Sequence, residues 1–278
     1  MITTQRNGQS VSVLLAARSI NPLSRLFQRE LGALLDKLEA QRTRLDAVIV
    51  SFDAQAAGRS HELEHLITPA QAADCMHLLD AYNGLLGRLE TLGVPLIATL
   101  SGEISGHALG LALACHRRLA LPDTRLSLPQ VRAGLAPMAG EIVRSVRLSG
   151  LQAAMPLLLE GATLTTRQAQ QAGLLHAIVA DEAELARVVL DKPAPSQPWQ
   201  TQADRLPGGA LHSAPVRTLL HGAPARLRAG ACSPAAEAVL CAMVESVQVD
   251  FNNALKIESR YFCQTAINHA RRAGRFSL

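Results

Sequence analysis

The sequence predicts a mixed α/β fold in which parallel strands are joined by helices, and three observations lead to this prediction. Short apolar runs alternate with segments of helical period along the first half of the chain. The runs at 47–52 and 95–100 are almost continuously apolar, which is typical of strands buried on both faces of a sheet. Apolar residues make up 48% of the chain and aromatic residues 3%, so we expect a core of Leu, Ala and Val side chains.

The first 120 residues follow the order strand, helix, strand, helix, strand, glycine-rich turn, helix, which implies parallel strands with helical crossovers. Leucines at intervals of three and four residues indicate the first helix. Thr68 and Pro69 are typical of the N-cap and first turn of the second. The expected elements are strands at 11–17, 47–52, 95–100 and from 118, and helices at 22–41, 68–92 and 107–115.

The later part of the chain changes character near residue 192. A helix at 165–172 and a strand at 174–179 are expected before that point. Prolines and the Gly208-Gly209 pair then indicate a linker, and a long helix is expected at 249–272. We therefore predict a core at 1–192, a Pro/Gly-rich linker at 193–215 and a helical C-terminal region at 216–278.

Charge and cysteine content narrow the functional classes. The net charge is +4 and the basic residues are scattered, so we expect a small anionic ligand rather than a nucleic acid. The five cysteines show no CxxC spacing, so we expect reduced thiols in a cytoplasmic protein. The N-terminal apolar run is too short for a secretory signal, and no stretch is long enough to predict a transmembrane helix.

A zinc-peptidase spacing occurs once in the sequence. His61-Glu62-Leu63-Glu64-His65 matches H-E-x-x-H, which places two imidazoles on one helix face. We interpret it as a chance match on a polar helix, because Glu64 adds a charge between the histidines and no third ligand is evident. We expect no metal, and a zinc hydrolase using His61 and His65 stays as a remote alternative.

Two further segments carry candidate chemistry. Gly102, Gly106 and Gly110 are spaced by four residues where a strand gives way to a helix. This spacing fits either close helix packing or a backbone that approaches a ligand, and the pattern alone favours neither. Glu141 follows an irregular segment and stands in the first turn of an expected helix beginning near Gly140. A carboxylate there is typical of a helix start.

These segments resemble the crotonase (enoyl-CoA hydratase/isomerase) superfamily. Residues 100–116 read LSGEISGHALGLALACH, similar to the family pattern I-N-G-x-A-x-G-G-G-x-E-L-x-L-x-C-D. Similar matches occur at 57–60, 129–141 and 160–175. Segments 198–209 and 249–262 resemble the end of the hydratase half in multifunctional fatty-acid oxidation α subunits.

The resemblance implies a spiral of ββα turns with a helical C-terminal region that forms a homotrimer or a dimer of trimers. It implies a CoA thioester as ligand, with no other cofactor. The thioester carbonyl would meet an oxyanion hole made by the backbone amides of Arg59 and His107. The residues that we expect to bind CoA are Arg18, Ala57, Gly58, Ser60 and Lys256.

The sequence departs from the family at both catalytic positions. Gly110 and Gln130 stand where the resemblance places two glutamates, and neither can act as an acid or base. We therefore expect no ordinary hydration, and we expect Gly110→Glu with Gln130→Glu to restore it by about 100-fold or more. The candidate replacement groups are Glu141, His107 and Glu103. The resulting hypothesis is an enzyme with non-standard chemistry on a CoA thioester; the alternative is a non-catalytic acyl-CoA-binding or scaffold protein.

Overall fold

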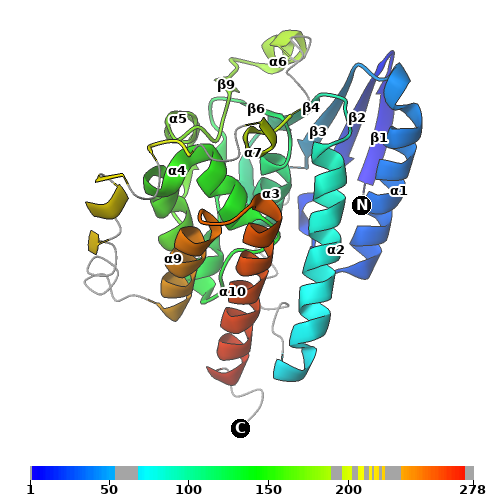
Figure 1. Cartoon of the computed structure of the whole chain (residues 1–278). Coiled ribbons are helices and arrows are strands. Elements are labelled where there is room, and N and C mark those ends of the chain that lie inside the picture. The colour runs from blue at the N-terminus through cyan, green and yellow to red at the C-terminus, as the bar shows by residue number, and fades with distance from the viewer. Residues whose placement is uncertain are drawn as a thin grey trace.

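The computed structural model describes residues 2–53, 68–188, 196–201, 206–209, 213–214, 216–218, 221–222 and 233–272. Figure 1 shows a sheet flanked by long helices, with α2 and α10 side by side. The six-stranded sheet has the order β1-β2-β3-β4-β6-β9, in which every pair except β1–β2 is parallel. Its strands are β1 (Ile2–Asn7), β2 (Ser10–Leu15), β3 (Ala47–Phe52), β4 (Leu96–Leu100), β6 (Arg117–Ala120) and β9 (Ala177–Ile178). The predicted parallel α/β architecture is therefore confirmed.

A second, smaller sheet was not predicted. It has the order β5-β7-β8, with β5 parallel to β7 and β7 antiparallel to β8. Its strands are β5 (Glu103–Ser105), β7 (Arg125–Ser127) and β8 (Leu164–Thr165). Strands of two or three residues are too short to show an alternating pattern, which is why the glycine-rich turn concealed β5. This sheet matters for the site because β5 leads directly into α3.

The first strand was also missed, although the sequence carries a signal for it. β1 pairs antiparallel with β2 across a turn in which Gly8 has a φ of 65°. Gly8 is the first of the two residues in the loop, and glycine is typical there because it adopts positive φ without steric cost. Gly8 therefore marks the hairpin turn, and β2 begins at Ser10 rather than at residue 11.

The two long N-terminal helices begin later than the sequence suggested. α1 (Arg25–Gln41) begins at Arg25 because the Ser24 side chain accepts a hydrogen bond from the N–H of Phe27 and so caps the helix. A short 3-10 helix, η5 (Pro69–Gln71), precedes α2 (Ala72–Glu90). The short helices η1 (Ala17–Ser19) and η2 (Arg42–Arg44) follow β2 and α1.

The expected strand at 174–179 shortens to two residues. Its first residues are held against the end of α5 (Thr166–Gln171) instead, because the N–H groups of Leu174 and Leu175 donate to the carbonyl of Ala169. A capping box at Thr165 and Gln168 begins that helix. Only Ala177 and Ile178 pair with β6, and these two residues form β9. Helix α6 (Glu182–Val188) follows.

The C-terminal region is helical as expected, and it packs on the core. Its long helices are α9 (Pro234–Ser246) and α10 (Phe251–Arg272), and both contact α4 (Glu141–Leu159). The short helix α7 (Pro198–Thr201) lies within the segment predicted as a linker. Its Trp199 stacks on Phe251 with ring centroids 4.7 Å apart, and Gln197 donates to the carbonyl of Ala114. The domain boundaries themselves stay predictions.

The apolar face of α10 is used within the chain. Leu255, Phe262 and Ala266 are buried against the protein's own core. These three side chains therefore pack within the chain. Among the described residues, no helix combines the length and hydropathy needed to cross a bilayer.

Candidate active site

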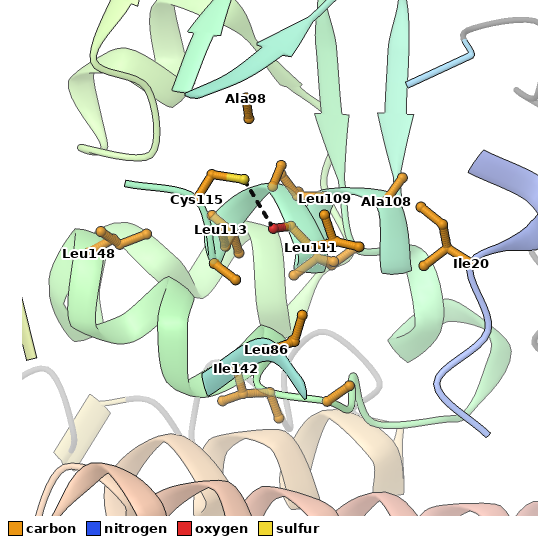
Figure 2. Packing of buried hydrophobic residues seen from close by; sticks show 14 of the residues in the cluster. Ile20, Leu86, Ala98, Ala108, Leu109, Leu111, Leu113, Cys115, Ile142 and Leu148 are labelled. Atoms are coloured by element: carbon orange, nitrogen blue, oxygen red, sulfur yellow. Dashed lines mark hydrogen bonds between the residues drawn. The ribbon is translucent and has the colours of Figure 1, made fainter. Parts of the chain in front are cut away.

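The site is organised around α3 (His107–Leu113), a short helix enclosed on all sides. Figure 2 shows Leu109, Leu111 and Leu113 radiating from α3 into a core that other elements complete. An all-apolar helix is stable only when it is buried in this way. The buried guanidinium of Arg118 donates to the carbonyls of Cys115 and Leu113, which holds the C-terminal end of α3. The helix is therefore a fixed platform for the residues at its other end.

The turn before α3 places His107 at the first helical position. Gly106 has a φ of 56° and its N–H donates to the carbonyl of Ser127 on β7. A left-handed φ favours glycine, so the backbone conformation of this turn explains why a glycine stands here. His107 then begins α3 with a half-buried side chain.

A second sharp turn, at residues 139 and 140, directly precedes α4. Ala139 and Gly140 both have positive φ, 61° and 84°, and Glu141 is the first residue of α4. A Cβ atom on Gly140 would lie 1.6 Å from Nη1 of Arg144, so only glycine fits there. Helix α4 is kinked at Gly150, where φ is 78°, and continues to Leu159.

The Glu141 carboxylate binds three groups from different elements. Its Oε1 lies 2.7 Å from Nδ1 of His107. Its Oε2 accepts hydrogen bonds from Nε2 of Gln130 at 2.8 Å and from the N–H of Met138 at 3.1 Å. Gln130 lies in the short helix η6 (Pro129–Ala133). The structure therefore brings together three of the residues that the sequence singled out.

Gly110 completes this cluster by lacking a side chain. A Cβ atom at Gly110 would lie 2.7 Å from Cγ and 3.0 Å from Oε1 of Glu141. Real Cβ atoms do not approach other atoms this closely, so Glu141 occupies the space that a side chain at 110 would need. The exchange of Gly110 and Gln130 for glutamates therefore meets an obstacle that the sequence did not reveal.

A second carboxylate supports the turn from the opposite side. Glu258 on α10 is fully buried and accepts hydrogen bonds from the N–H groups of Gly140 and Val143, both at 2.9 Å. Burial raises the pKa of Glu258 to about 8, although these N–H donors favour its charged form. Glu258 anchors the start of α4, so it fixes the position of Glu141.

A buried ion pair braces the same turn. Nε of Arg144 donates to Glu90 on α2 at 2.7 Å, and Nη1 of Arg144 donates to the carbonyl of Ala139. Burial raises the pKa of the Glu90 carboxyl, while the Arg144 guanidinium opposes that rise. Removing either partner would leave a buried charge uncompensated, which is costly.

Two polar side chains at this cluster, Tyr82 and Gln130, are buried. Tyr82 on α2 is buried, which raises the pKa of its hydroxyl, and the nearby Glu141 adds to that rise. Gln130 is also buried, and within the described part of the chain its Oε1 has no hydrogen-bond partner. Because Nε2 of Gln130 is directed at Glu141, this oxygen can only accept, so it suits a ligand or water that donates.

The remaining predicted site residues lie elsewhere. Glu103 is exposed on β5, outside the hydrogen-bonded cluster of Glu141. Arg18 is exposed in η1, and Lys256 is exposed on α10 in a cavity of about 770 Å³ beside α2. The residues expected at the loop of the oxyanion hole and at the zinc spacing lie outside the described residues: Ala57, Gly58, Arg59, Ser60, His61 and His65.

Comparison with known proteins shows which family the chain belongs to. A model of the enoyl-CoA hydratase/isomerase family matches residues 6–192. The chain belongs to this family. It is 30% identical over 171 residues to the fatty acid oxidation complex subunit alpha of Idiomarina loihiensis. That match covers 61% of this chain but only 24% of the relative, so the chain corresponds to a small part of that protein.

Solved structures of the enoyl-CoA hydratase/isomerase family share the fold. An enoyl-CoA hydratase from Rhodobacter sphaeroides has a TM-score of 0.67 at 19% identity, with 98% of this chain and 88% of that chain covered. A putative enoyl-CoA hydratase from Streptomyces avermitilis has a TM-score of 0.61 at 20% identity, with 99% and 89% covered. The predicted family and crotonase fold are therefore confirmed.

Sequence reasoning missed how the site residues fit together. It ranked Glu141, His107 and Glu103 as separate candidates, and it treated Gly110 and Gln130 only as missing acids. The structure shows Glu141 in the space over Gly110, in contact with the other two. The available signal was a paired change: Gly110 stands where the family pattern has an acid, and Glu141 stands where the similar segment of the family has a glycine.

Proposed function

We propose that the chain binds an acyl-CoA thioester and transfers a proton at carbon 2 of the acyl group. The observation that carries this proposal is the carboxylate–imidazole contact of 2.7 Å between Glu141 and His107 in the space over Gly110. It supplies an acid–base pair where the residues expected to do that work, Gly110 and Gln130, cannot. Membership of the enoyl-CoA hydratase/isomerase family supports the thioester as ligand.

The proposed step balances without any other reagent. The bond between carbon 2 and its hydrogen breaks, the proton goes to the acid–base pair, and the electron pair moves into an enolate at the thioester oxygen. The backbone amide of His107, with that of Arg59, would stabilise this oxygen, and one such donor contributes about 10²–10³-fold. Return of the proton restores the pair. Hydration needs a second group to activate water, so proton exchange or isomerisation fits this site better.

We propose that Arg18 and Lys256 bind the phosphate groups of CoA. The cavity that contains Lys256 also has Arg260 and Arg271 on its wall. These cations give one face of α10 the charge needed to meet an anionic cofactor tail. Isothermal titration with acetoacetyl-CoA tests this, and no heat at millimolar ligand would contradict CoA binding.

Deuterium exchange tests the proposed reaction. The protein is incubated with butyryl-CoA in D₂O, and loss of the carbon-2 proton signal is followed by NMR. We expect exchange by the wild type and a loss of about 100-fold or more in Glu141→Ala. The matched control is Glu237→Ala, since Glu237 is exposed on α9. No exchange by the wild type under saturating butyryl-CoA would contradict the proposal.

A binding protein without turnover is the second candidate. It is favoured by the complete burial of Glu141, whose oxygens are already bonded to protein groups. Heat on titration with butyryl-CoA, together with no deuterium exchange in the wild type, would establish this alternative. Exchange that depends on Glu141 would exclude it.

The assembly and location of the chain are proposed on the resemblance. We propose a homotrimer or a dimer of trimers, and a stable monomer by sedimentation at micromolar concentration would contradict it. We propose a cytoplasmic location, which fits the free thiols of Cys75, Cys115, Cys241 and Cys263.

A further inference from the structure

Two buried thiols from different helices meet beside the cavity between α2 and α10. Cys75 lies near the start of α2 and Cys263 lies in the second half of α10, and Figure 1 shows these helices side by side. The two side chains share a hydrogen bond, and both are buried. A hydrogen bond between thiols places their sulfur atoms next to each other, which is the first requirement for a disulfide.

The cavity gives a small oxidant a path to one of these thiols. Cys263 lies on its wall, as does Met76, which follows Cys75 on α2. Lys256 and Arg271 lie on the same wall, so the cavity is electropositive. Electropositive surroundings that open toward solvent are typical of reactive cysteines, because the thiolate is the form that reacts.

The hydrogen bond makes the two thiols unequal. It lowers the pKa of Cys263, which accepts, and raises the pKa of Cys75, which donates and is also desolvated by burial. Cys263 is therefore the thiol that ionises first, and it is the one on the cavity wall. Cys115 provides the contrast, because its complete burial raises its pKa to about 12 and its thiol donates to the carbonyl of Leu111.

We infer that Cys75 and Cys263 form a redox modification site, which a hydroperoxide converts into a disulfide between α2 and α10. The Cys263 thiolate attacks one oxygen of hydrogen peroxide, which forms a sulfenic acid and releases hydroxide. The Cys75 sulfur then displaces a second hydroxide from the sulfenic sulfur. The two protons lost by the thiols convert both hydroxides to water, so two thiols and one peroxide give one disulfide and two waters. This inference does not depend on the proposed proton transfer.

The disulfide would join the two helices that support the start of α4. Glu258 on α10 accepts from the N–H of Gly140, and Glu90 on α2 accepts from Arg144. The link would also close the long loop between residues 75 and 263, which lowers the entropy of the unfolded chain. Oxidised protein should therefore unfold at a higher urea concentration than reduced protein.

Peptide mapping of the full chain tests the pairing directly. Reduced protein is treated with hydrogen peroxide, unfolded, blocked with N-ethylmaleimide and digested with trypsin. The sequence places Cys75 in peptide 60–88, Cys263 in 261–271, Cys115 in 89–117, and Cys232 with Cys241 in 229–256. We expect peptide 60–88 joined to 261–271, and its loss when dithiothreitol is added before blocking. Thiols that stay free, or a sulfinic acid at residue 263 without the link, would overturn the inference.

Serine variants separate the roles of the two sulfur atoms. Cys75→Ser should stop at the sulfenic acid on Cys263, which dimedone traps, whereas Cys263→Ser should lose both the link and the trapped adduct. The control is Cys241→Ser, since Cys241 is exposed on α9, and it should keep the link. Dimedone on Cys75 in Cys263→Ser, with none on Cys263 in Cys75→Ser, would overturn the assigned order of attack.

Urea midpoints before and after peroxide treatment test whether the link fits the native packing. We expect the midpoint to rise in the wild type and to stay unchanged in Cys75→Ser, which cannot form the link. A linked protein with a lower midpoint than the reduced one would show that α2 and α10 must move apart to form the disulfide. That outcome would overturn the inference that the native contact is poised for oxidation.

Discussion

Glu141 and Glu258 are two buried carboxylates at the start of the same helix, but their partners differ. Glu258 reaches the turn from α10 and accepts from the backbone N–H groups of Gly140 and Val143. Glu141 lies on α4 itself and accepts from two side chains besides one backbone N–H, and one of those side chains, His107, can carry a proton. Backbone donors cannot change their protonation, so Glu258 can only hold the turn. Glu141 is joined to an imidazole, which can give up or take a proton.

The first prediction removes the space that distinguishes Glu141. Gly110→Glu should lower the free energy of unfolding by about 3 kcal/mol, because the new side chain overlaps Glu141 and adds a like charge beside it. Urea denaturation followed by circular dichroism measures the loss. Combining it with Glu141→Ala should recover most of that stability, because the new carboxylate then has the space.

The control for this change is Gly84→Ala on α2, where an added Cβ meets no atom within 4 Å. Replacing a helical glycine by alanine at an open position should stabilise the protein by about 0.5–1 kcal/mol. A Gly110→Glu protein as stable as the wild type would contradict the packing seen here. It would also restore the simpler expectation that glutamates at 110 and 130 are tolerated together.

The architecture was predictable where local chemistry and periodicity agree. β3 has the bounds that its apolar run predicted, because a strand covered on both faces is almost continuously apolar. β5 and β8 could not be predicted, because strands of three and two residues depend on partners far along the chain. The contact between Glu141 and His107 was equally hidden. It depends on two turns, at Gly106 and Gly140, whose relative placement is a tertiary property.

The second prediction uses the pKa of Glu258. Burial raises it from an ordinary 4.5 to about 8, so the folded state binds a proton that the unfolded state has released. The free energy of unfolding should therefore fall as the pH rises from about 4.5 to about 8. Glu258→Gln should lack this part of the fall, and at pH 5 it should be about 1–3 kcal/mol less stable, since it leaves a buried N–H poorly bonded.

Urea midpoints between pH 5 and pH 9 test this prediction. The gap between Glu258→Gln and the wild type should narrow as the pH rises. Glu237→Gln, on the exposed face of α9, serves as the control with no change in slope. Parallel pH profiles for the wild type and Glu258→Gln would show that Glu258 stays ionised and acts only as an acceptor.

The third prediction changes the partner of Glu141. Gln130→Glu would place a second carboxylate about where Nε2 of Gln130 now donates at 2.8 Å. Two carboxylates at this distance share one proton, so the variant should lose about 1–2 kcal/mol at pH 8 and less at pH 5. Adding Glu141→Gln should restore one acid and one amide and recover stability. A single variant whose loss does not grow with pH would contradict this account.

The smallest effect is expected at Glu103, the third acid–base candidate that the sequence singled out. It lies on β5 beside Ile104, and strand alternation directs Ile104 to the core and Glu103 to solvent. Glu103→Gln should change the free energy of unfolding by less than about 0.5 kcal/mol. It should also change deuterium exchange from butyryl-CoA by less than about twofold, because an exposed carboxylate outside the cluster of Glu141 has no path to the reacting carbon. A tenfold loss of exchange in a folded Glu103→Gln protein would make Glu103 an acid–base group and would leave the buried pair of Glu141 and His107 with a supporting role.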